Sequence, residues 1–151
     1  MRKSLTLLLI STSLVLSCTQ IEKSPDNKTV IQTDKAPASI GVYSQAIRSG
    51  NTLYLSGQIG LIPETRELAG DDLEAQTHQT LRNIQSVLEA AGYAMSDVVK
   101  AQVYLDDMND YSAFNEIYMS YFPTDPPARA VVEVSRIPLD AKVEIMVTAT
   151  K

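Results

Sequence analysis

Two residues near the C-terminus, Arg129 and Glu144, have the chemistry needed to bind and hydrolyse a small acid. Arg129 opens the apolar run AVVEV, and Glu144 alternates with apolar residues in AKVEIMVTAT. A guanidinium presents a planar fork that binds a carboxylate through two hydrogen bonds, and a glutamate can orient or deprotonate a water molecule. The simpler alternative is a cross-strand ion pair that only joins two strands, worth up to about 1 kcal/mol when exposed. Spacing alone favours that alternative.

Other reaction classes find less support in the sequence. His78 is the only histidine and has no cysteine or second histidine at ligand spacing, so no metal site is expected. A glycine-rich phosphate loop and a Gly-x-Ser-x-Gly elbow are both missing. The formal net charge of −5 argues against a nucleic-acid partner.

The elements that must position Arg129 and Glu144 follow from hydrophobic periodicity. Two strand-like runs flank the turn signal Ser49-Gly50-Asn51, which predicts a hairpin. Apolar residues at spacings of three and four predict one helix after Asp72 and another in DYSAFNEIYMSYF. Strict alternation predicts a strand in VVKAQVYLDDM and two final strands in RAVVEVSRI and AKVEIMVTAT. The order β-β-α-β-α-β-β predicts an α+β domain with both helices on one face of a mixed sheet.

The period of two along a strand then assigns side chains to the two faces of the sheet. The face under the helices is expected to receive apolar residues throughout: Leu53, Leu55, Val99, Ala101, Val103, Leu105, Ala130, Val132, Val134, Val143, Ile145 and Val147. The opposite face is expected to combine apolar and polar residues: Tyr54, Ser56, Gln58, Gln102, Tyr104, Arg129, Val131, Glu133, Glu144, Met146 and Thr148. This face is too apolar to remain in water, which suggests burial between subunits.

The N-terminus is expected to be removed or anchored. Arg2 and Lys3 precede an apolar run too short to cross a membrane, as in a secretory signal. The stretch LVLSC resembles the lipobox of bacterial lipoproteins, which implies lipidation of Cys18 and a periplasmic location, with a soluble periplasmic protein as the alternative. We therefore expect a signal peptide at residues 1–17, a flexible tether at 18–34 and one domain at 35–151. Loss of the signal would change the net charge from −5 to −7, because it removes two positive charges.

Five spaced stretches resemble the RidA family of reactive-intermediate (imine) deaminases, also called YjgF-like proteins or endoribonuclease L-PSP. They are IGVYSQAI, LYLSGQIGLIPETREL, LRNIQSVLEAAG, PARAVVEVSRIP and AKVEIMVTAT, and the likeness runs from about Ile40 to Thr150. It implies a chorismate-mutase-like fold, a homotrimer with sites between subunits, no cofactor, and hydrolysis of 2-imino acids to 2-keto acids and ammonia.

The resemblance also implies roles for individual residues. Arg129 matches the arginine that binds the substrate carboxylate, and Glu144 matches the acid near the attacking water. The remaining matches line the substrate pocket: Tyr43, Ser56, Gly57, Asn115 and the backbone at Val131.

Three departures from the family pattern bear on these roles. Val131 stands where well-known members have cysteine, which excludes thiol chemistry there. Val42 and Gly60 replace frequent prolines, and the export signal places the substrate outside its usual compartment. Two alternatives to an imine deaminase stay open: an extracytoplasmic module that binds small carboxylates without turnover, and a ribonuclease or translation inhibitor.

Overall fold

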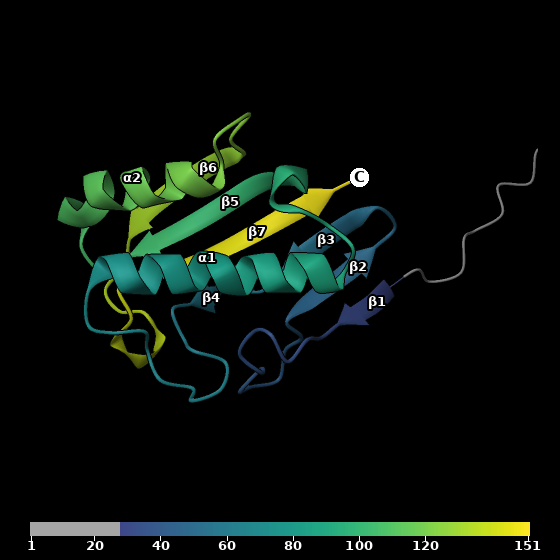
Figure 1. The fold of residues 1–151 in the computed structure, drawn as a ribbon, viewed down its shortest axis with the longest axis horizontal. Coiled ribbons are helices and arrows are strands. Elements are labelled where there is room, and N and C mark those ends of the chain that lie inside the picture. Colours follow the sequence, from purple (N-terminus) through teal and green to yellow (C-terminus); the bar gives the residue numbers. More distant parts are fainter. Residues whose placement is uncertain (1–27) are drawn as a thin grey trace, which may run out of the picture.

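The computed structural model describes residues 28–151, which form two helices over one mixed sheet (Figure 1). The predicted signal peptide, the candidate lipidation site Cys18 and the first part of the predicted tether lie outside the described residues. The strands are β1 (Lys28–Ile31), β2 (Ala46–Ser49), β3 (Thr52–Leu55), β4 (Gln58–Ile59), β5 (Val98–Leu105), β6 (Ala128–Glu133) and β7 (Val143–Thr150). The helices are α1 (Leu73–Ala90) and α2 (Tyr111–Tyr121).

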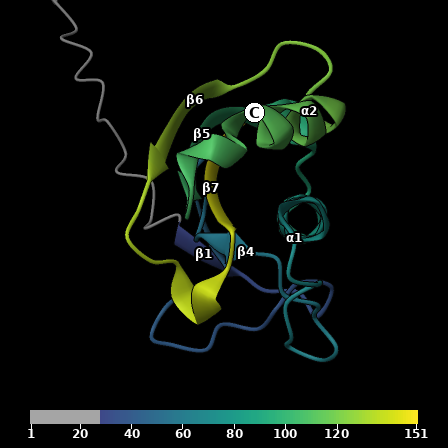
Figure 2. The same cartoon turned by 90° about the vertical axis from the view of Figure 1, so that its left-hand side faces the viewer.

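The sheet order places the C-terminal strand at the centre. Within residues 28–151 the order is β1-β2-β3-β7-β5-β6, and β4 pairs with β7 beyond the end of β3. Strands β5 and β6 are parallel and the other pairs antiparallel. Both helices cover one face, as Figure 2 shows. The predicted α+β class, mixed sheet and one-sided helices are confirmed.

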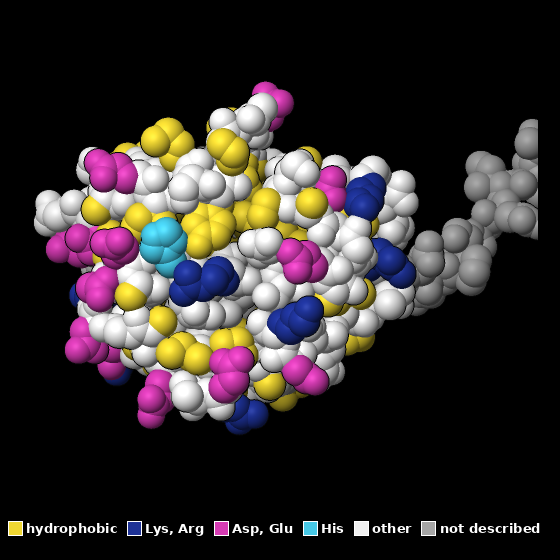
Figure 3. Space-filling model, in the orientation of Figure 1, with side chains coloured by type: hydrophobic (Ala, Val, Ile, Leu, Met, Phe, Trp, Pro, Cys, Tyr) yellow, Lys and Arg dark blue, Asp and Glu magenta, His cyan; other side chains and the backbone are white. Residues whose placement is uncertain are grey.

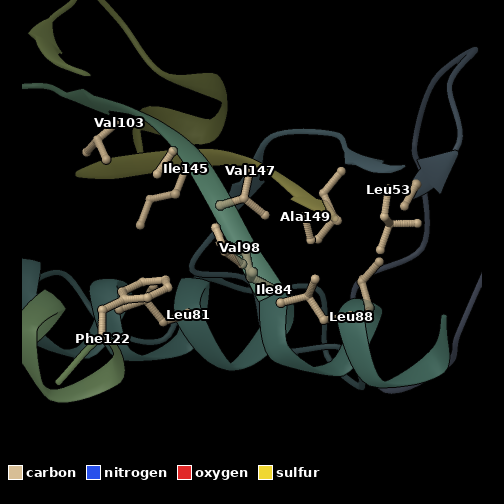
Figure 4. Close-up of a cluster of buried hydrophobic side chains, with 14 of the residues drawn as sticks. Leu53, Leu81, Ile84, Leu88, Val98, Val103, Phe122, Ile145, Val147 and Ala149 are labelled. Atoms are coloured by element: carbon tan, nitrogen blue, oxygen red, sulfur yellow. The ribbon is translucent and has the colours of Figure 1, made fainter. Parts of the chain in front are cut away.

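Helix α1 forms where its apolar spacing predicts. Asp72 caps it by accepting a hydrogen bond from the Ala75 backbone N–H at 2.8 Å, and Gly92 follows its end with a φ of +81° that favours glycine. Its apolar stripe, including Leu81, Ile84 and Leu88, faces the inner side chains of β3, β5 and β7 (Figure 4). No helix among residues 28–151 is long and apolar enough to span a membrane.

The predicted tether is too long and the strand count too low. Residues 28–31 form β1, which pairs antiparallel with β2, so the last part of the range 18–34 belongs to the sheet. Its sequence, KTVI, is short and exposed except at Ile31, and therefore carried no clear periodic signal. The two-residue strand β4 is likewise an addition to the predicted order.

Predicted face assignments are wrong at three places: at Val99, along β6, and at Gln58, which pairs with the buried Ile145 and so lies on the helix side. A bulge between Val98 and Lys100 leaves Val98 buried and Val99 46% exposed. In β6, Arg129 pairs with the buried Ala101, so Arg129 and Val131 lie on the helix side of the sheet. Ala130 and Val132 lie on the open face, the reverse of the expectation. The β6 sequence has apolar residues on both faces of the strand. Because β6 is an edge strand without a fully buried face, the apolar pattern does not specify which side chains point toward the helices.

Candidate functional site

A pocket of about 420 Å³ opens beside Glu144. Its walls come from the loop between β1 and β2, the segment from Ser56 through β4 to Leu61, the turn at Pro138, and β7. Four of the residues singled out in the sequence line it together: Tyr43, Ser56, Gly57 and Glu144. The structure thus brings one group of the predicted site residues into a common cavity.

Glu144 projects from β7 onto the open face of the sheet, where it pairs with Tyr104 of the neighbouring strand β5. Gly57 lets its carboxylate lie against the chain, because a Cβ built on Gly57 would overlap the Glu144 Oε1. Burial raises the pKa of the Glu144 carboxyl above its usual value. A carboxylate that is more basic than usual is a better proton acceptor for a bound water.

The loop that carries Tyr43 is fixed by a buried amide, Gln45. Its Oε1 accepts from the Thr33 N–H at 2.7 Å, and its Nε2 donates to the carbonyls of Thr33, Ala36 and Pro37 at 3.0, 3.2 and 2.9 Å. The Gln45 carbonyl also accepts from the Ser56 N–H at 3.0 Å. Because Gln45 is only 3% exposed, these bonds hold the loop against the Ser56 wall of the pocket.

Ser56 and Tyr43 differ in how free their hydroxyl groups are. The Ser56 Oγ donates to the Ser44 carbonyl at 2.7 Å, which commits its proton to the protein. The Tyr43 ring is half exposed, and its hydroxyl accepts from the Ile40 N–H at 3.5 Å. Tyr43 therefore keeps a donor that can turn toward a ligand.

Arg129 lies in a second, shallower hollow with Val131, Met108 and Tyr111. Its Nη2 donates to the Asn115 Oδ1 at 2.5 Å and to the Tyr111 hydroxyl at 3.5 Å. The guanidinium also stacks over the Tyr118 ring, with Cζ 4.5 Å from the ring centroid. Helix α2 thus orients the arginine, and two further sequence-predicted residues, Asn115 and Val131, belong to this second group.

The pKa values of the two tyrosines around Arg129, Tyr111 and Tyr118, are shifted in opposite directions. Hydrogen bonding to Asn115 and then to Arg129, together with the charge of Arg129, lowers the pKa of the exposed Tyr111. Burial raises the pKa of Tyr118 to about 12, although the charge of Arg129 acts against it. The arginine is therefore flanked by a neutral aromatic face and a polarised hydroxyl.

The two groups of residues lie on opposite faces of the sheet within one chain. Arg129 contacts α2 on the helix side, whereas Glu144 lines the pocket on the open side. The expectation that Arg129, Ser56 and Glu144 are neighbours on one face of the sheet is wrong, because Arg129 points to the helix side of β6. The ion pair weighed above does not form, since no salt bridge joins these residues within 28–151.

Besides Tyr118, three contributors were not singled out from the sequence as site residues. Gln45 positions the pocket loop, Tyr111 adds a hydroxyl beside Arg129, and Met146 adds an apolar wall beside Glu144. A glutamine next to a tight turn carries no motif of its own, so only the fold reveals Gln45. Met146 could have been found, because it follows Glu144 by two residues on the same strand face. His78, considered for a metal, instead bonds through Nδ1 to the Tyr121 hydroxyl at 2.9 Å.

Comparison with known proteins identifies the family. The sequence model of the family described as Endoribonuclease L-PSP matches residues 33–151. The chain belongs to this family, also called RidA. A RutC family protein of Pyrococcus horikoshii is 52% identical over 124 residues, which cover 82% of this chain and 98% of that protein. The mouse protein named 2-iminobutanoate/2-iminopropanoate deaminase is 44% identical, over 81% of this chain and 90% of the mouse protein.

Solved structures of RidA proteins share the fold described above. The crystal structure of RidA from an Antarctic Psychrobacter superposes with a TM-score of 0.79 at 45% identity, covering 82% of this chain and 99% of the other. The residues matched by the family model, 33–151, include both the pocket beside Glu144 and the hollow around Arg129.

Proposed function

We propose that the protein hydrolyses reactive 2-imino acids, such as 2-iminobutanoate and 2-iminopropanoate, to 2-keto acids and ammonia. The observation that carries the proposal is the pair of half-sites: an oriented arginine in one and a glutamate with a raised pKa in the other. Relatives at 44–45% identity support it, being named 2-iminobutanoate/2-iminopropanoate deaminase in mouse and Reactive Intermediate Deaminase A in Arabidopsis thaliana.

The complete site forms between protomers in this proposal. Because the sheet separates Arg129 from Glu144 within one chain, the arginine hollow of one protomer must meet the glutamate pocket of its neighbour. A homotrimer supplies three such sites through a repeated head-to-tail contact. The open sheet face supports burial against a neighbour, since Tyr54 and Val132 are 52% and 45% exposed there.

The chemistry divides between the two half-sites. Arg129, preset by Asn115 and Tyr118, binds the substrate carboxylate through its guanidinium fork. Glu144 holds a water and takes one of its protons as the water oxygen bonds to the imine carbon and the C=N electron pair moves to nitrogen. Glu144 then returns that proton to the nitrogen of the tetrahedral intermediate. The C–N bond then breaks, the hydroxyl proton passes to the departing ammonia as the keto group forms, and the ammonia leaves as ammonium.

The site mainly contributes binding and orientation, because the carbon of a protonated imine is already electrophilic. The resemblance to RidA proteins implies no cofactor, and the steps above use only the substrate, water and this chain's own side chains. We also propose that the protein is an exported lipoprotein anchored through Cys18 on the periplasmic side of a bacterial membrane, as LVLSC suggests.

Surface charge does not favour nucleic acid as the substrate. The face in Figure 3 carries scattered Lys and Arg side chains and a gathering of Asp and Glu at its left edge. With a net charge of −5, the chain offers no basic stripe on this face for a phosphate backbone.

The test is ammonia release from freshly generated 2-iminobutanoate by purified wild type, Arg129→Ala and Met119→Ala. Met119 is 65% exposed on α2 and contributes to neither half-site, so it serves as a surface control. We expect wild type and Met119→Ala to accelerate release equally, and Arg129→Ala to lose at least 100-fold in kcat/KM while keeping its melting temperature within a few degrees. Equal rates for wild type and Arg129→Ala would exclude the proposal. Saturable binding of 2-keto acids without turnover would instead support a binding module.

A further inference from the structure

The pocket beside Glu144 has mostly apolar walls. Ile40 and two prolines come from the loops, Ile59 and Leu61 from the β4 segment, and Met146 from β7. Met146 lies on the same strand face as Glu144, two residues further on. A substrate held at Glu144, with its carboxylate on Arg129, therefore has its side chain beside hydrocarbon.

The polar side chains of this lining are largely committed to the protein. The amide nitrogens of Gln45 and Gln58 donate to backbone carbonyls, and the Ser56 hydroxyl donates to Ser44. Among the described lining residues, the Tyr43 hydroxyl is the one side-chain donor not directed at backbone. A polar substrate side chain would lose its water here without gaining matching donors, which costs binding free energy.

The pocket is also larger than the smallest substrates require. Its volume of about 420 Å³ falls within the range of roughly 300–1,000 Å³ that is typical of sites for ligands with many more atoms than a three-carbon acid. The methyl group of 2-iminopropanoate would leave most of the apolar wall uncovered. A longer aliphatic or thioether side chain would cover it.

We infer that the pocket selects 2-imino acids with larger apolar side chains, such as those derived from leucine and methionine, over the alanine-derived imine and over polar imines of similar length. This inference rests on the proposed deaminase function. Each additional buried CH₂ contributes about a fourfold gain in binding. The leucine side chain has three carbons more than that of alanine, so the gain is about sixtyfold at full burial, and we expect at least tenfold.

The experiment compares imines generated in place from alanine, leucine, methionine and glutamine by an L-amino-acid oxidase, with catalase to remove peroxide. Glutamine provides a polar side chain of nearly the length of methionine. We expect kcat/KM for the leucine and methionine imines to exceed that for the alanine and glutamine imines by tenfold or more. Equal values, or alanine the best, would overturn the inference and leave the deaminase proposal intact. Absence of deamination with every imine would instead overturn the deaminase proposal.

Met146→Ala tests the wall directly, with Met119→Ala as the matched surface substitution. Met146→Ala should lower the ratio of kcat/KM for the leucine imine to kcat/KM for the alanine imine several-fold, and Met119→Ala should leave this ratio unchanged. An equal loss for both imines would contradict a role in selecting the side chain. If Met146→Ala does not fold, Ile40→Ala at a position 67% exposed tests the same wall with the same expected outcomes.

Discussion

Substitution of Gly57 by alanine should separate catalysis from stability. A Cβ at residue 57 would overlap the Glu144 Oε1 and lie 2.8 Å from its Cδ, whereas ordinary contact begins at 3.4 Å. The carboxyl carbon must therefore retreat by at least 3.4 − 2.8 = 0.6 Å, and the oxygen by more. Misplacement of a catalytic group by about 1 Å costs on the order of 100-fold in rate. We expect kcat for ammonia release from 2-iminobutanoate to fall by about that factor.

The same substitution should leave folding unaffected. Gly57 is not among the glycines with positive φ, so alanine fits its backbone, and the stiffer unfolded chain adds roughly 0.4–1 kcal/mol of stability. Gly60→Ala is the contrasting case, because its Cβ would lie 2.7 Å from the Gln76 Cα, where only backbone can yield. Gly60→Ala should lower the melting temperature by several degrees. Unchanged kcat in Gly57→Ala, or a loss of activity matched by a loss of stability, would refute the assignment of Glu144.

Three further predictions concern Glu144 and the shared site. Burial raises the pKa of Glu144, so kcat/KM should fall as the pH drops through a value above 4.5, the usual pKa of a glutamate. The Glu144→Gln variant should lose most of its activity, and its residual kcat/KM should no longer fall in this acidic range. Because the folded-state pKa of Glu144 is raised, ionisation of this carboxyl lowers the free energy of unfolding as pH rises through that pKa. The Glu144→Gln variant should therefore melt no lower than wild type at neutral pH. A clearly lower melting temperature would contradict the desolvation of this carboxyl. If each site takes Arg129 from one protomer and Glu144 from the next, co-expression of Arg129→Ala with Glu144→Gln in equal amounts should restore about one quarter of wild-type activity, the product of two chances of one half. Size-exclusion chromatography of the mixture checks the assembly, and activity no higher than that of either variant alone would rule out a shared site.

Sequence patterns predicted the helices and strands correctly where one face of the element is fully buried. The Leu81, Ile84 and Leu88 spacing specifies α1 because every member meets the sheet, and β7 alternates cleanly because it lies at the sheet centre. At the edges the patterns were insufficient. The β6 sequence has small or β-branched residues on both faces of the strand, and the expectation that the helix side is apolar throughout was wrong at Arg129.

Tertiary partners explain that failure. Helix α2 presents the Tyr118 ring and the Asn115 amide to Arg129, and together they satisfy a guanidinium that the sequence alone would leave in water. The grouping of Tyr43, Ser56, Gly57 and Glu144 came from family resemblance and lies in one pocket. Their separation from Arg129 depends on which face of its strand each side chain occupies. A shift of one residue in strand register moves a side chain to the other face without any change in composition.

The position of β1 has a mechanical consequence for the protein. Chain that precedes Lys28 leads directly into this four-residue edge strand, whereas the bonds of Gln45 to Thr33, Ala36 and Pro37 come later along the chain. A pull on the N-terminal segment therefore loads the β1–β2 pairing first. Because β1 has a single partner strand and only Ile31 buried, it can peel away before any force reaches the loop that carries Tyr43. If the chain is anchored through Cys18, as proposed above, tension on the N-terminal segment would therefore open this edge strand before it reached the pocket.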